Sequence, residues 1–175
     1  MIRSFRWAFL ALLLSTAALA QDAPQASKTF CEDAGGFDQW DFWVGHWNVY
    51  SNDEKRALAG TNSVVKHYAN CLITETWVDV NGNGGFSINY YNPVREQWRQ
   101  VWVSNGYSID YTGGLNDKGQ MVLEGEIDNY QPNTSTPFRG IWTPQENGDV
   151  IQRFEVYDAG KDQWNVWFEG LYVKK

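Results

Sequence analysis

Residues 92–111, NPVREQWRQVWVSNGYSIDY, decide the fold class of this chain. Between the turn signals Asn92-Pro93 and Asn105-Gly106, two sets of side chains alternate along residues 97–103. One side carries Trp98, Gln100 and Trp102. A period of two is typical of a strand, because successive side chains of an extended chain point to opposite faces. The pair Asn105-Gly106 favours a tight hairpin, since its residues accept positive φ values. The segment therefore predicts two antiparallel strands.

The same pattern repeats along most of the chain. We expect strands at residues 47–51, 62–67, 71–78, 85–91, 97–103, 107–115, 120–127, 137–144, 150–157 and 163–173. Ahead of them, apolar residues at helical spacing from Phe37 to Trp47 predict one short helix or 3-10 turn. About ten antiparallel strands with short connections fit an up-and-down barrel or a sandwich. No long helix separates the strands, which argues against a parallel sheet.

The first twenty residues contain the three parts of a secretory signal in order. Arg3 and Arg6 precede an apolar block at residues 7–14, and Ala18-Leu19-Ala20 is a small-x-small cleavage site. The block is shorter than the ~20 residues that a membrane span requires. We therefore expect cleavage after Ala20 and a periplasmic or secreted product. The expected boundaries are a signal peptide at 1–20, a leader at 21–36 and a single β-barrel domain at 37–175.

Charge and cysteine content narrow the class of protein. The chain of 175 residues has 14 basic and 21 acidic side chains, a formal net charge of −7. This balance argues against a nucleic-acid partner, because phosphate contacts require clustered Lys and Arg. Cys31 and Cys71 are the only cysteines. In an oxidising compartment such a pair predicts one disulfide, closing a loop of about forty residues.

Candidate groups for metal or cofactor chemistry are few. The chain has two histidines, His46 and His67, whereas a zinc site draws on about three or four ligands. We expect no metal and no cofactor.

Glu75 is the most informative carboxylate. It alternates with Ile73 and Trp77, so a shared inward face would place it among apolar neighbours and raise its pKa. Arg139, in another expected strand, is a candidate partner. Two interpretations stay open: a structural ion pair with Arg139, or an acid/base or ligand-anchoring carboxylate inside a cavity.

Two glutamines lie in line with aromatic residues. Gln100 alternates with tryptophans, and Gln152 shares a face with Phe154. An inward glutamine costs free energy unless it is paired. The two side chains are either mutually satisfied core amides or polar groups that line a cavity.

In the last strand, the alternation predicts one shared face for Trp164, Val166, Phe168 and Tyr172.

Residues 37–49, FDQWDFWVGHWNV, resemble the opening motif of small exported bacterial proteins of unassigned function, the DUF1579-like or lipocalin-like barrel proteins. The resemblance continues through residues 70–77, 98–103, 139–144 and 148–152. It implies an all-β, antiparallel up-and-down barrel of the lipocalin or calycin kind, with about ten strands. Gly45 and Trp47 also resemble the first lipocalin signature, in which a Trp closes one barrel end under a late basic residue. The late basic residues here are Lys174 and Lys175. Haem-binding barrels of similar size use a His on a late strand. No His follows His67 here, so the resemblance does not favour haem as a ligand.

These observations lead to one main hypothesis and two alternatives. The main hypothesis is an exported protein that holds a small hydrophobic or amphipathic molecule inside an aromatic-lined barrel. The candidate ligand-binding residues are Glu75, Trp77, Trp98, Gln100, Trp102, Arg139, Trp142, Gln152 and Phe154. One alternative is a small isomerase, lyase or hydrolase with Glu75 as general acid or base. The other is a filled barrel whose exposed aromatic residues bind a partner.

Overall fold

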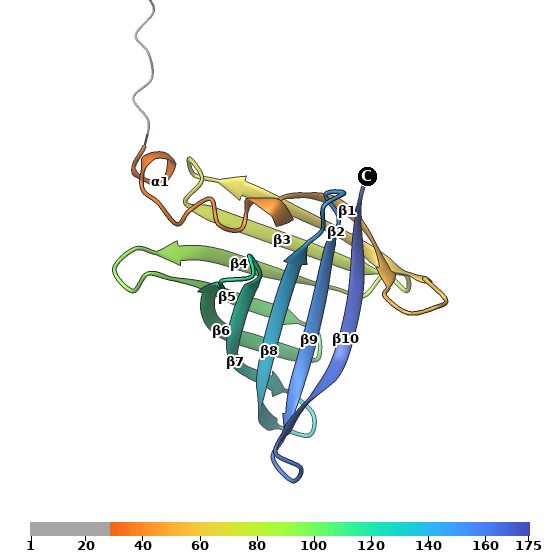
Figure 1. Ribbon diagram of the computed structural model, residues 1–175. Coiled ribbons are helices and arrows are strands. Elements are labelled where there is room, and N and C mark those ends of the chain that lie inside the picture. Colours follow the sequence, from red (N-terminus) through yellow and green to blue (C-terminus); the bar gives the residue numbers. More distant parts are fainter. Residues whose placement is uncertain (1–28) are drawn as a thin grey trace, which may run out of the picture.

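The computed structural model describes residues 29–175, which form a closed antiparallel β-barrel of ten strands (Figure 1). β1 (Gly45–Ser51) pairs with both β2 and β10 (Gln163–Lys174), and this pairing closes the ring. The other strands are β2 (Leu58–His67), β3 (Leu72–Asp79), β4 (Gly84–Asn92), β5 (Gln97–Ser104), β6 (Tyr107–Leu115), β7 (Met121–Asn129), β8 (Thr134–Pro144) and β9 (Val150–Asp158). The predicted all-β barrel is confirmed. The expected signal peptide lies outside the described residues.

The segment before β1 covers one end of the barrel. It contains the short helix α1 (Phe30–Asp33) and the 3-10 turn η1 (Asp41–Trp43), the latter within the segment where a short helix or turn was predicted. The indole of Trp40 stacks on that of Trp43 at 5.0 Å between ring centroids. Trp40 also contacts Trp98 at 5.4 Å and Trp142 at 4.8 Å, edge to face. These four fully buried indoles form a plug, which we call the tryptophan plug.

Trp47, in β1, packs at the same closed end of the barrel as the tryptophan plug. Its indole Nε1 donates a hydrogen bond of 3.0 Å to the carbonyl oxygen of Trp43. The Nζ of Lys174 lies 5.5 Å from the centre of the Trp47 ring, within the range of a cation–π contact. A Cβ on Gly45 would lie 3.3 Å from the Lys174 side chain, so a larger residue there would crowd this contact. Lys174 therefore lies over the ring of Trp47 at this end of the barrel.

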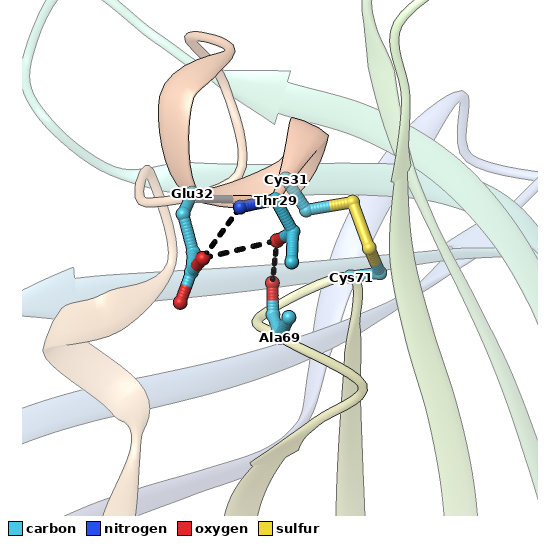
Figure 2. Close-up of a disulfide and its surroundings, with 5 residues drawn as sticks. All are labelled: Thr29, Cys31, Glu32, Ala69 and Cys71. Carbon is cyan, nitrogen blue, oxygen red and sulfur yellow. Dashed lines mark hydrogen bonds between the residues drawn. A yellow bond between two sulfur atoms is a disulfide. The ribbon is translucent and has the colours of Figure 1, made fainter. Parts of the chain in front are cut away.

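A disulfide fastens the N-terminal segment to the same end (Figure 2). Cys31 in α1 is bonded to Cys71 in the loop between β2 and β3, with 5.2 Å between their Cα atoms. The predicted disulfide is therefore present. The Thr29 amide donates to a Glu32 carboxylate oxygen at 2.7 Å, and the Thr29 hydroxyl donates to the Ala69 carbonyl oxygen at 3.4 Å. These contacts hold a four-residue helix that its own backbone hydrogen bonds would not stabilise.

A β-bulge corrects the predicted facing of β10. The register shifts between Val166 and Phe168, so the alternation is broken at that point. Phe168 pairs with the inward Phe154, whereas Trp164 pairs with Tyr157 on the outer wall. The expected common face for Trp164, Val166, Phe168 and Tyr172 is therefore wrong: only the last two point into the barrel.

Within residues 29–175, the helical segments are too short to span a lipid bilayer.

Candidate functional site

The barrel interior contains a cavity of about 410 Å³. Binding sites for small molecules commonly have about 300–1,000 Å³. The residues that line it come from β3, β5, β6, β9 and β10. They are Glu75, Trp77, Gln100, Trp102, Tyr107, Ile109, Tyr111, Gln152, Phe154, Trp167, Phe168 and Tyr172. The interior is therefore hollow beside the tryptophan plug rather than filled by side chains.

Aromatic rings form most of the cavity wall near the end opposite the plug. Trp102 and Tyr107 flank the hairpin between β5 and β6, and Trp167 comes from the bulge of β10. The rings of Tyr107 and Trp167 meet edge to face at 5.7 Å, and Phe154 lies 6.2 Å from both Trp167 and Phe168. Trp167 is 49% exposed, which marks this side as the entrance.

Glu75 lies at the polar side of the cavity and is only 4% exposed. Its Oε1 accepts a hydrogen bond of 2.7 Å from the Asn62 amide, and its Oε2 accepts one of 2.8 Å from the Ser87 hydroxyl. A longer contact of 3.4 Å joins Oε2 to Gln100 Nε2. All three donors are neutral. Burial raises the pKa of Glu75 from 4.5 to about 7, although the hydrogen bonds from Asn62 and Ser87 act in the opposite direction.

A buried network extends from Glu75 on both sides. On one side, Gln100 Nε2 donates to Asn89 Oδ1, while Gln100 Oε1 accepts from the Tyr111 hydroxyl. On the other side, Asn62 donates to the Tyr172 hydroxyl at 3.3 Å, and Tyr172 donates to Gln152 Oε1. Gln100 and Gln152 are thus held by protein partners and also line the cavity. The two glutamines do not pair with each other: Gln100 is bonded to Asn89 and Tyr111, and Gln152 to Tyr172.

Burial keeps the two phenols of this network neutral. It raises the pKa of Tyr111 and that of Tyr172 well above 10.0. Both hydroxyls therefore donate to glutamine oxygens at any ordinary pH. Glu75 is then the lining group whose charge changes near neutrality.

One donor in the cavity wall makes no hydrogen bond of normal geometry to the protein, although it lies near the Tyr107 hydroxyl. Trp102 is 8% exposed, and its Nε1 is buried without a hydrogen-bond partner. The ring lies over Gly85, where a Cβ would come within 2.1 Å of an indole carbon. An unpaired buried N–H costs free energy that a ligand acceptor could recover.

The structure separates the predicted site residues into three groups, of which the third is Arg139 alone. Those that line the cavity are Glu75, Trp77, Gln100, Trp102, Gln152 and Phe154. Trp98 and Trp142 instead belong to the tryptophan plug, where Trp98 Nε1 donates to Gln39 Oε1 at 3.2 Å. Trp98 and Gln100 both point into the barrel from β5, but Trp98 lies in the plug and Gln100 lies at the cavity.

Arg139 lies on the outer wall of the barrel. Its Nε donates to Glu155 Oε2 at 2.8 Å, and its guanidinium stacks over the Trp164 ring at 4.4 Å. A second carboxylate, that of Glu124, lies 3.4 Å from Nη1. Of the two interpretations left open for Glu75, the ion pair with Arg139 is therefore wrong. β8 alternates so that Phe138, Gly140 and Trp142 face inward, which directs Arg139 outward.

Several residues of the polar network were missed from the sequence. They are Asn62, Ser87, Asn89, Tyr111 and Tyr172. In β4 the usual pattern is inverted, because Ser87 and Asn89 are fully buried while Phe86 and Ile88 are 47% and 40% exposed. The signal available was Ser87 and Asn89 themselves, two polar residues on one face of a strand that pairs with Glu75.

No protein-family model matches the chain. A search of the curated proteins likewise finds no match. Among residues 29–175, no three His, Cys, Asp or Glu side chains are grouped so that they could hold a metal ion. Fold and cavity therefore define the class: a closed antiparallel barrel with an aromatic-walled internal cavity and a buried carboxylate.

Proposed function

We propose that this chain is an exported binding protein that holds one small hydrophobic or amphipathic molecule inside the barrel. The observation that carries the proposal is the cavity of about 410 Å³, walled by aromatic rings on one side and bounded by a hydrogen-bonded polar network on the other. Sites of this kind gain affinity from apolar contact, while a few polar groups orient the ligand. The disulfide between Cys31 and Cys71 fits an oxidising compartment, and the proposed export agrees with it.

The tryptophan plug and the network around Glu75 support a rigid cavity. The plug is stacked and fully buried, and the glutamines that face the cavity are already hydrogen-bonded. A preformed site loses little side-chain entropy when a ligand binds. We therefore propose binding without a large rearrangement of the barrel.

The test is titration with N-phenyl-1-naphthylamine, a neutral hydrophobic fluorophore, followed by energy transfer from tryptophan. The substitution Ile109→Trp adds bulk inside the cavity, whereas Ile88→Trp makes the same change on the exposed outer wall. We expect binding to weaken about tenfold or more in I109W and to stay unchanged in I88W. No binding to the wild type, or equal effects of the two variants, would contradict the proposal.

A catalytic role of Glu75 is the second candidate. The observation that favours it is a cavity-lining carboxyl whose pKa is about 7, suited to give or take a proton near neutrality. A panel of small organic substrates for isomerase, lyase and hydrolase reactions tests it. Turnover by the wild type that disappears in E75Q, while N-phenyl-1-naphthylamine still binds, would support catalysis. Absence of turnover in both proteins leaves binding as the function.

A further inference from the structure

Within residues 29–175, the carboxylate of Glu75 has no cationic partner. The three groups that donate to it are an asparagine amide, a serine hydroxyl and a glutamine amide. Among the cavity-lining residues there is no Lys, Arg or His. Buried charges in proteins are ordinarily paired, because an isolated ion loses its hydration. Above about pH 7, where Glu75 ionises, the described part of the chain supplies no counter-charge for it.

The carboxylate also keeps room for a further donor. A carboxylate offers about four acceptor sites, and the protein occupies three of them, the third through a long contact of 3.4 Å. Because Glu75 lines the cavity, a group that lies inside the cavity can approach the carboxylate. An N–H of a bound molecule would complete the carboxylate's hydrogen bonds.

The aromatic wall, like the Glu75 carboxylate, favours a positively charged ligand. The rings that line the cavity are those of Trp77, Trp102, Tyr107, Tyr111, Phe154, Trp167, Phe168 and Tyr172. The face of an aromatic ring is electron-rich and attracts cations, an effect that strengthens when the ion is desolvated. The whole chain has a formal net charge of −7, which raises the local concentration of cations.

From the unpaired carboxylate and the aromatic wall together, we propose that the ligand is an organic ammonium ion with an apolar body. Its N–H group binds Glu75 and its body lies between the rings of Trp102, Phe154 and Trp167. This inference rests on the proposed binding function and specifies the class of ligand. An organic acid is disfavoured, because its carboxylate would face Glu75 without any positive group between them.

Three probes of nearly equal shape test the charge preference. They are 2-(1-naphthyl)ethylamine, 2-(1-naphthyl)ethanol and 1-naphthylacetate, each titrated by calorimetry at about pH 8. We expect the amine to bind at least about tenfold more tightly than the alcohol, and the acid to bind most weakly. Equal affinity of amine and alcohol, or tightest binding of the acid, would overturn the inference.

Two matched variants test whether the preference for the amine arises at Glu75. In E75Q the amine and the alcohol should bind within about threefold of each other, because the carboxylate is replaced by a neutral amide of the same shape. In Glu126→Gln the same charge is removed from the exposed outer face of β7, and the preference should persist. A preference that survives in E75Q, or that disappears in E126Q, would contradict a contact with Glu75.

The pH dependence of the wild type provides a test that needs no variant. The other titratable groups in the cavity are Tyr107, Tyr111 and Tyr172, and burial raises the pKa of each. Among the residues that line the cavity, Glu75 alone then changes charge between about pH 5 and 8. We expect the amine to bind more weakly as the pH falls below about 7, by up to about tenfold per pH unit, while the alcohol stays constant. A flat profile for the amine would refute the inference.

These outcomes distinguish the two proposals. If N-phenyl-1-naphthylamine binds in the cavity but the amine shows no preference, the binding function stands and the ammonium inference fails. If neither the fluorophore nor any naphthyl compound binds, both proposals fail.

Discussion

Ionisation of Glu75 should make the folded protein less stable as the pH rises. Burial raises the pKa of this carboxyl from 4.5 to about 7. Between these values the folded chain binds more protons than the unfolded chain, so the free energy of unfolding falls with increasing pH. The stability due to neutral Glu75 is complete below about pH 4.5 and is lost by about pH 7. The difference between the two pKa values corresponds to roughly 3 kcal/mol.

The assay compares urea unfolding of the wild type and E75Q from about pH 4.5 to 8. Tryptophan emission monitors the unfolding. Other carboxyl groups titrate in both proteins, so the difference between the two unfolding free energies isolates Glu75. That difference should change by about 3 kcal/mol across the range, in favour of the variant at high pH. The control E126Q removes an exposed carboxylate and should follow the wild type.

Parallel curves for the wild type and E75Q would refute the reasoning. They would show that the carboxyl titrates in the folded chain as it does in the unfolded chain. Glu75 would then be hydrated rather than buried within the network of Asn62, Ser87 and Gln100.

Four further perturbations test the disulfide, the plug and the cavity wall. Replacing both Cys31 and Cys71 by Ser should lower the unfolding free energy by about 3–4 kcal/mol, as measured by urea denaturation, because a loop of about forty residues is released. Trp43→Ala, in the fully buried plug, should cost about 3–5 kcal/mol in the same assay. Trp167→Ala, at the half-exposed entrance, should cost less than about 1.5 kcal/mol yet weaken fluorophore binding several-fold. Gly85→Ala would place a methyl group 2.1 Å from an indole carbon; we expect a loss of about 1–3 kcal/mol and a changed near-ultraviolet circular dichroism spectrum.

The strands could be predicted because their signal is local. Alternation over a few residues and a turn at each end determine whether a segment is extended, whatever lies across the sheet. The prediction at 107–115 matches β6 (Tyr107–Leu115), and the others differ mainly at their ends. The inward faces of β5 and β9 also followed, since Trp98 and Phe154 indicated the buried side.

Two features could not be predicted because they depend on the neighbouring strand. The bulge in β10 is set by pairing with β9, and it moves Trp164 to the outer wall. In β4, Phe86 and Ile88 would ordinarily mark the inner face. They point outward because Ser87 and Asn89 hydrogen-bond to Glu75 and its neighbours inside the barrel.

The sequence by itself determined the succession of extended segments and the pairing of the cysteines, and it marked Glu75 as a carboxylate that an inward face would bury. Only the tertiary structure decided which polar groups surround that carboxylate, and it placed Arg139 on the opposite side of the wall. The physical reason is that alternation assigns a side chain to one of two faces of its own strand. Closure of ten strands into a ring then decides which faces meet, and at what height along the barrel.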